Sequence, residues 1–432
     1  MRRGPDIALL VRRSVWQVAV LVSLALVAGC VARPRVLEPQ RQSLAVFAAA
    51  PQWQQLIDPR PAAPGTLAWL GGDVASSVQA GPDRWLWIFG DTLLGTVRDD
   101  CPDGVAYCDR DVDDRLTHGM IANTVGVMTR RPDGGLAPLD THWRMVDGEP
   151  RPIFEAEAPG EFLWPLSLAY VDGVLLVAAS RHTRAMGLAS LGDVLLRVTN
   201  PEALPQQWVY DRTPVPHTRP DVPGETAALT WATALVPRKG AVYLFGRLGS
   251  AAGMGTVVAR FPTADLGAES WVLAPEYLQR RTASSADLVW TTAFDGDLLY
   301  EIPGLPGTSE ATITFDERLG WITYRIEWMS HTIALYTAAD LMGPWTARGS
   351  IYEIPPPEGC VGRIGDEGAG CVGVPYFAYA AKAHPSWAGP GTKVVSYNVN
   401  VLSADLDDAL RAAERARAFY IPRLIAATPT GE

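Results

Sequence analysis

The sequence is poor in residues and motifs that mark several large enzyme classes. It has only five cysteines and six histidines among 432 residues. It contains no glycine-rich phosphate-binding loop and no Gly-x-Ser-x-Gly nucleophile motif, and it lacks the repeated Ser-x-Asp-x-Gly-x-x-Trp box of sialidases. These absences argue against a phosphate-loop enzyme, a serine hydrolase with a nucleophile elbow and a sialidase with its usual repeats.

Positive charge is also scarce. Lysine and arginine number 37 against 47 aspartates and glutamates, which gives a net charge of −10. Because nucleic-acid binding depends mainly on cations that neutralise phosphates, this balance argues against a nucleic-acid partner.

Long hydrophobic runs are missing as well. Four arginines stand within the first 13 residues, and the apolar run Val18–Ala28 that follows is too short to span a bilayer comfortably. The run ends in small residues before Cys30, which resembles a bacterial lipoprotein processing signal. Residues 1–29 are therefore predicted to be a signal peptide, with Cys30 lipidated; the alternative is an ordinary secretory signal with an incidental cysteine.

The predicted location of the protein is the cell envelope. Residue Val31 is not an aspartate, so nothing argues for retention in an inner membrane, and the outer membrane is the expected location where the cell has one. Residues 30–65 are rich in proline and alanine and are predicted to be a tether, with a short helix around residues 44–56.

The remaining cysteines form two close pairs in the chain. Each pair closes a short loop that contains glycine, and an exported protein meets an oxidising environment. We predict two local disulfides, because neither pair has the two-residue spacing of a zinc knuckle. The pairs are Cys101 with Cys108 and Cys360 with Cys371.

From residue 66 onward one pattern recurs: a short apolar strand, a polar stretch and a tryptophan. The tryptophans at 143, 208, 271 and 345 stand 65, 63 and 74 residues apart, and a looser fifth copy runs from Val399 to Tyr420. Five copies with several short strands each predict an all-β, five-bladed β-propeller over residues 66–432. A pair of β-sandwiches would not give five copies. Only residues 405–418 are convincingly helical, which predicts a short C-terminal helix.

The stretches 71–77 and 85–92 predict two strands joined by the turn Ala80–Arg84. A hairpin can bring a carboxylate at the start of one strand beside one at the end of its partner. Asp73 and Asp91 are therefore a candidate catalytic pair, since glycosidases use two carboxyl groups. The alternative is that both are ordinary turn residues at strand ends.

In a propeller the ends of the innermost strands line a central pocket, so residues near those ends are candidates for substrate binding. Tryptophans there could stack on sugar rings, and the polar residues could bind hydroxyl groups. For each residue a packing or surface role is the alternative. The candidates are Trp164, Trp231, Glu310 and His384.

Several of these motifs together resemble a family of bacterial five-bladed β-propellers, first described as a domain of unknown function, which includes endo-D-arabinanases. The resemblance covers roughly residues 67–425. The similar segments are Gly71-Gly72-Asp73, Phe89–Thr92, Asn123–Val127, Leu163–Pro165, Gly343–Trp345, His384-Pro385 and Val395–Asn400. It implies that Asp73 and Asp91 are catalytic and that Asn123 belongs to the substrate site. Val74 and Ala75 depart from the small or aromatic pair expected after Asp73.

The sequence thus predicts a lipid-anchored glycoside hydrolase, acting as a monomer on a polysaccharide or envelope glycan, arabinan among the candidates. Two alternatives remain: a non-catalytic propeller that binds a glycan or a protein, and an assembly lipoprotein that docks envelope proteins. No metal or catalytic cofactor is predicted. The acidic stretch 109–114 could hold a structural calcium ion, but it lacks the glycine and distant glutamate of an EF-hand.

Overall fold

The computed structural model of the 432-residue chain describes residues 47–59, 66–96, 120–183, 189–215, 229–250, 253–371, 373–384, 387–388, 391–403 and 419–427. Strands dominate these ranges, and their one α-helix is α2 (Pro51–Ile57). The all-β prediction is confirmed. None of the helices in these ranges is both long and apolar enough to cross a bilayer. The expected helix at 405–418 lies outside the described residues.

Within the described residues, five antiparallel sheets have four or five strands each. The first contains β3 (Ser76–Gln79), β4 (Arg84–Phe89), β7 (Thr124–Thr129) and β8 (Asp140–His142). The second contains β11 (Glu161–Val171), β12 (Val174–Thr183), β13 (Ala189–Val198) and β14 (Tyr210–Val215). The third contains β15 (Leu229–Arg238), β16 (Ala241–Ser250), β17 (Gly253–Pro262), β18 (Glu276–Arg280) and β19 (Leu288–Thr291).

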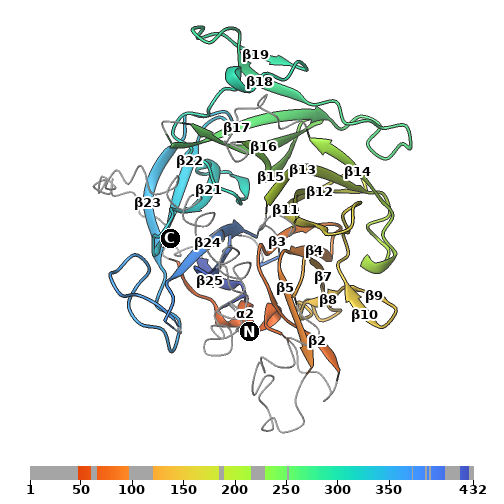
Figure 1. Cartoon of the computed structure of the whole chain (residues 1–432), viewed down its shortest axis with the longest axis vertical. Helices are drawn as coiled ribbons and strands as arrows, with labels where there is room; N and C mark the ends of the chain where they lie inside the picture. The colour runs from red at the N-terminus through yellow and green to blue at the C-terminus, as the bar shows by residue number, and fades with distance from the viewer. Residues whose placement is uncertain are drawn as a thin grey trace, which may run out of the picture.

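The fourth sheet contains β20 (Ile313–Asp316), β21 (Gly320–Ile326), β22 (Thr332–Ala338) and β23 (Thr346–Glu353). The fifth contains β24 (Tyr376–Ala383), β25 (Lys393–Val401), β26 (Arg423–Ala427) and β1 (Ala48–Ala49). Two smaller sheets pair β2 (Leu67–Gly72), β5 (Thr92–Thr96) and β6 (Met120–Ile121), and β9 (Arg144–Val146) with β10 (Glu149–Arg151). The large sheets are arranged around a common centre, with β3, β11, β15 and β24 toward it (Figure 1).

The buried core is divided among the boundaries between sheets. Each of its five apolar clusters joins two of the large sheets: the first with the second, and so on until the fifth meets the first. The last boundary includes Trp87 of β4 and Trp387, whose rings lie 5.8 Å apart. Burial of apolar surface therefore holds the sheets side by side in a ring rather than face to face in sandwiches.

The beginning of the described chain completes the fifth sheet. Strand β1 pairs with β26, Ala48 opposite Ala426 and Ala49 opposite Ile425. Phe47 is buried beside Tyr324, at a ring distance of 5.8 Å. Residues 47–57, which the sequence analysis placed in the tether, thus belong to the packed fold, because they cover the open edge of β26 and bury an aromatic ring.

The recurring apolar strand before each tryptophan is the third strand of the first four large sheets: β7, β13, β17 and β22. Each pairs with an apolar second strand, which is β4, β12, β16 or β21. The fifth copy was wrong in detail. Val399–Val401 belongs to the end of β25 instead of opening a new strand, because residues 393–401 form one continuous strand against β24.

Candidate active site

Asp73 and Asp91 meet where the chain passes between sheets. Asp73 lies between β2 and β3, and Asp91 lies between β4 and β5. The Asp73 amide donates to the Asp91 carbonyl at 3.3 Å, and the Gly90 amide donates to the Asp73 carbonyl at 3.1 Å. A hairpin of β3 and β4 is present, with Ser76 opposite Ile88. The predicted first strand 71–77 is divided, however, because Gly71 and Gly72 end β2 and pair with β5, and β3 begins only at Ser76. The two aspartates are therefore neighbours, as the sequence predicted.

The backbone beside Asp73 is strained. Val74 has a φ of 66° and Ala75 a φ of 47°, in the left-handed region that side chains with a Cβ rarely adopt. For a β-branched valine this conformation is especially unfavourable, and such strain concentrates at functional sites. Ala380, next to Tyr379 on β24, has a φ of 55°.

Gly90 leaves the space that the Asp73 side chain occupies. A Cβ at Gly90 would lie 2.3 Å from Oδ1 of Asp73 and 2.7 Å from Cγ2 of Val74. No real carbon atom can approach that closely, so glycine is required here if the carboxyl group is to keep its position.

The Asp73 carboxyl group is half-buried, and its Oδ2 accepts a hydrogen bond of 2.9 Å from the hydroxyl of Tyr379. Burial raises the pKa of Asp73 well above its usual value, and the charges of Asp91 and Glu310 raise it further; Tyr379 and the charge of Lys382 act in the opposite direction. Burial also raises the pKa of Tyr379, so the phenol stays protonated and can donate.

Asp91 has a different partner. Its Oδ1 accepts a 2.7 Å hydrogen bond from the indole Nε1 of Trp164, which is only half-buried. The Trp164 ring lies 4.3 Å from the ring of His182. Burial lowers the pKa of His182 to about 4, so this histidine is neutral at physiological pH. Trp164 thus offers one edge to a carboxylate while part of its surface remains accessible.

A buried ion pair contributes to the electrostatic environment of Asp73. Nζ of Lys382 lies 3.3 Å from Oε2 of Glu310, with the lysine side chain fully buried. Lys382 also donates to the carbonyl of Leu166 on β11. Burial lowers the pKa of Lys382, and the charges of Glu310 and Asp73 oppose that change. Glu310 is therefore part of the electrostatic environment of Asp73 and has little surface for direct contact with a ligand.

Arg247 and Asp193 extend the charged cluster toward the third sheet. The carboxylate of Asp193 accepts a 2.6 Å hydrogen bond from the Trp231 amide. Burial lowers the pKa of Arg247, while the charges of Asp193 and Glu310 raise it, so the guanidinium remains a cation. The central region thus contains acids and bases from several sheets.

Three inner strands carry β-bulges near this region. The irregularities fall at Pro165–Ser167 in β11, Thr230–Ala234 in β15 and Tyr379–Lys382 in β24. In β24 one extra residue separates Tyr379 from Lys382, which changes the strict alternation of side chains. Both can consequently act on Asp73, although a regular strand would point them to opposite faces.

Four residues predicted to bind substrate are buried instead: Glu310, described above, and Asn123, Trp231 and His384. Asn123 is fully buried. Its side-chain Nδ2 donates hydrogen bonds to the carbonyls of Phe154 and Leu163 at 2.9 and 3.0 Å, and its Oδ1 accepts one from the Phe154 amide at 2.9 Å. Trp231 is fully buried, 5.6 Å from the ring of Tyr277. Neither side chain has a free face for a sugar, because packing and backbone hydrogen bonding occupy them.

His384 is also structural. Its Nδ1 lies 2.7 Å from the Ser77 hydroxyl and its Nε2 lies 2.8 Å from the Ser396 hydroxyl, and its ring stacks on Trp87 at 4.5 Å. Burial, and then the charge of Lys382, lower the pKa of His384 to about 3. The neutral imidazole links the fifth sheet to the first instead of contacting a ligand.

The predicted Cys360–Cys371 disulfide is present. Cys30, the Cys101 and Cys108 pair and the acidic stretch 109–114 lie outside the described residues. Within the ranges that the structure describes, no three histidine, cysteine, aspartate or glutamate side chains form a group that could hold a metal ion.

Sequence reasoning missed Tyr379, Lys382, Asp193, Arg247 and His182. Lys382 stands near the end of β24 among alanines, with His384 just after the strand, and a lysine there was a usable signal. The others had no local signal, since each contributes only through sheets that are distant in the sequence.

Comparison with known families gives this site a context. A family model described as "Domain of unknown function (DUF5005)" matches residues 65–427. The chain belongs to this family. The resemblance found in the sequence was to a family first described as a domain of unknown function, and the matching family model carries such a description. No curated protein matches the sequence of this DUF5005 protein.

Several solved structures are similar to it to different degrees. A Bacteroides ovatus protein with an inferred hydrolase activity is 15% identical, with a TM-score of 0.61 over 92% of this chain and 96% of that one. Zg3597, a family 117 glycoside hydrolase of the marine bacterium Zobellia galactanivorans, is 9% identical, with a TM-score of 0.46 over 90% and 92% of the two chains. A Trypanosoma rangeli sialidase is 11% identical, with a TM-score of 0.36 over 83% of this chain and 44% of that one. At such identities the likeness to the Bacteroides ovatus protein establishes the fold alone.

Proposed function

We propose that this DUF5005 domain is a glycoside hydrolase in which Asp73 is the general acid and Asp91 is the ionised carboxylate. The observation that carries the proposal is that these two aspartates lie side by side in the connections between β2 and β3 and between β4 and β5, with the pKa of Asp73 raised well above its usual value. Glycosidases need one carboxyl group that is protonated and one that is charged.

The surroundings of the pair support this division of roles. A protonated Asp73 can give its proton to the leaving oxygen of a glycosidic bond. Asp91 accepts from the Trp164 indole, and hydrogen bonding to the charged form of a carboxyl group favours that form. Asp91 would then attack the sugar or activate a water molecule.

Trp164 and Tyr379 are the proposed positioning residues. Trp164 holds Asp91 by its Nε1 and keeps part of its ring accessible, which suits contact with a sugar face. Tyr379 holds Oδ2 of Asp73. The hydrolase activity inferred for the Bacteroides ovatus protein agrees with this proposal.

We also propose that the five large sheets are the five blades of a propeller and that arabinan is a candidate substrate. We further propose that the protein is exported as a monomer and anchored in the cell envelope through lipidated Cys30, with the outer membrane as its location. Metabolic labelling with a lipid precursor, lost in a Cys30→Ser variant, tests the anchor.

The activity is tested on the protein lacking residues 1–29. Release of reducing sugar is measured on D-arabinan, plant arabinan, xylan and polysialic acid for the wild type, Asp73→Asn and Asp91→Asn, with the turn variant Asp172→Asn as control. We expect each site variant to lose at least about 100-fold in rate, as general acid–base residues typically do. No turnover on any glycan, or turnover unchanged in both site variants, would move the assignment to a non-catalytic binding propeller.

A further inference from the structure

A row of three aromatic rings leads outward from Asp73. It begins with Tyr379, whose hydroxyl bonds the carboxyl group, continues to Phe377 at a ring distance of 5.1 Å and ends at Trp328, 5.4 Å from Phe377. The three rings are tilted against one another by 30° and 45°. The row therefore connects the proposed catalytic pair with the surface.

Two sheets build the row. Phe377 and Tyr379 are two residues apart on β24, before its bulge, so they lie on one face of that strand. Trp328 lies in the turn between β21 and β22 of the fourth sheet. The fourth sheet therefore positions Trp328, and the fifth sheet positions Phe377 and Tyr379.

The outer end of the row is unusually exposed. Trp328 is 55% exposed to solvent, and no other tryptophan in the described ranges is exposed to a comparable degree. Phe377 and Tyr379 are half-buried. Exposed aromatic surface is costly in water, and a flat ring next to a polar site suits stacking on the apolar face of a sugar.

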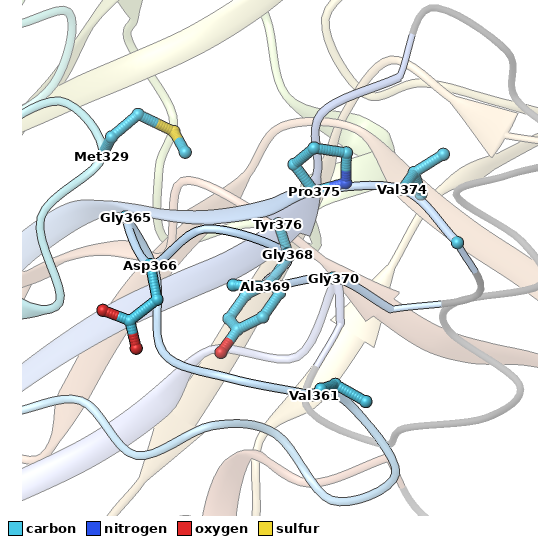
Figure 2. A pocket seen from close by; sticks show the side chains of 11 residues that line it. Met329, Val361, Gly365, Asp366, Gly368, Ala369, Gly370, Val374, Pro375 and Tyr376 are labelled. Atoms are coloured by element: carbon cyan, nitrogen blue, oxygen red, sulfur yellow. The ribbon is translucent and has the colours of Figure 1, made fainter.

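A cavity of about 460 Å³ is lined by residues next in sequence to Trp328 and Phe377. Met329, which follows Trp328, and Tyr376, which precedes Phe377, both line it, together with glycines of the loop closed by the Cys360–Cys371 disulfide. Figure 2 shows these two side chains with the carboxylate of Asp366 at one side of the space. The cavity is thus lined by the sequence neighbours of Trp328 and Phe377, and the exposed ring of Trp328 lies at the surface nearby.

We propose that Trp328 and Phe377 form a binding subsite for a polysaccharide chain whose scissile unit sits at Asp73 and Asp91. Successive sugar units would stack along the row, with Tyr379 at its inner end. This inference rests on the proposed function for the position of the scissile unit. It assigns the protein a preference for long glycan chains over short ones.

The test compares Trp328→Ala and Phe377→Ala with Phe315→Ala. Phe315 is a matched control, because it is 61% exposed and packs on Trp321 at 5.3 Å. It pairs with the beginning of β21, whereas Trp328 follows the end of that strand. Affinity for D-arabinan, plant arabinan, xylan and polysialic acid is measured by isothermal titration in the wild type and in an Asp73→Asn background. Hydrolysis is measured on the bound polymer and on an aryl glycoside of its sugar.

We expect Trp328→Ala to weaken polymer binding by about three- to tenfold, the range of one aromatic contact, with Trp328→Phe retaining most of the affinity. Turnover of the aryl glycoside and the affinity of Phe315→Ala should not change. Unchanged polymer affinity in both row variants, an equal loss on the aryl glycoside, or no binding of any polymer by the wild type overturns the subsite. Polymer binding that depends on Trp328 without any hydrolysis would instead retain the subsite and reject the catalytic proposal.

Discussion

Tyr379 donates a hydrogen bond of 2.9 Å to Asp73 across 306 residues of sequence. The donor belongs to the inner strand of the fifth sheet, and the acceptor precedes the inner strand of the first. These two sheets are neighbours only because the last sheet packs against the first. The proposed active site is therefore complete only in the closed ring.

Replacing Tyr379 by phenylalanine should move the pH dependence of hydrolysis. The hydroxyl lowers the pKa of Asp73 by stabilising its charged form, so its removal raises that pKa. Because the general acid must be protonated, activity is lost as pH rises through the pKa, and the alkaline limb of kcat/KM should shift upward. The size of the measured shift gives the contribution of the hydrogen bond, at about 1.4 kcal/mol per pH unit.

Tyr277→Phe is the control for that experiment. The Tyr277 hydroxyl is buried without a hydrogen-bond partner in the described part of the chain, and its ring packs on Trp231. Its removal should leave the pH profile unchanged. An alkaline limb that moves downward in Tyr379→Phe, or equally in both variants, contradicts the assignment of Asp73 as the acid.

Asp73→Asn should stabilise the protein at neutral and alkaline pH. The folded-state pKa of Asp73 is raised, so the folded protein resists the loss of a proton that the unfolded chain gives up near its ordinary value of 3.8. The resulting destabilisation is absent below that value and grows as pH rises toward the folded pKa, at about 1.4 kcal/mol per pKa unit. Thermal melts between pH 4 and pH 8 should show a gain in Tm that vanishes at the acidic end; a gain that is constant with pH would refute this account.

Gly90→Ala should reduce activity without unfolding the protein. The new methyl group would overlap Oδ1 of Asp73 and the side chain of Val74, so the carboxyl group must move away. Gly267→Ala is matched, because its Cβ would meet only Val174 at an ordinary 3.9 Å. We expect kcat to fall at least about tenfold in Gly90→Ala, since small misplacements of catalytic groups are costly. Retention of full kcat would show that Asp73 is not the acid.

His384→Gln should reduce the sensitivity of the fold to acid. The pKa of His384 is lowered to about 3, so between pH 6.5 and 3 the unfolded chain binds a proton that the folded protein excludes. Its contribution to stability is therefore lost as pH falls, by up to about 1.4 kcal/mol per pH unit. Urea denaturation should give a shallower decline in the variant below pH 6.5, while His331→Gln serves as the control for the loss of a histidine outside this network. Parallel declines would contradict the role of His384.

Local patterns were sufficient for much of the fold. The turn residues at 80–84 and the apolar stretches beside them predict the hairpin of β3 and β4, and its register brings Asp73 to Asp91. The recurring strand and tryptophan pattern predicts most second and third strands. These features depend on neighbours in the sequence, so the sequence carries them directly.

Other residues were misjudged because their surroundings come from distant sheets. Trp164 and Trp231 both stand near the ends of inner strands, yet the first remains half-exposed beside Asp91 and the second is enclosed beside Tyr277. His384 resembled a ligand-binding histidine, but Ser77 and Ser396 occupy both of its nitrogens. Burial of this kind depends on the docking of sheets and has no local signature.

The sequence by itself determined the all-β class, the hairpin that joins the two aspartates and the cysteine pair that forms a disulfide, because turn chemistry, side-chain alternation and short loop closure act within a few residues. Only the tertiary structure decided that Tyr379, Lys382 and Glu310 surround Asp73. A bulge in β24 and the packing of the fifth sheet against the first place Tyr379 and Lys382 there, and Glu310 comes from the segment that precedes β20. The raised pKa of Asp73 is therefore a property of the closed ring, since burial and the neighbouring charges arise only when the distant strands meet.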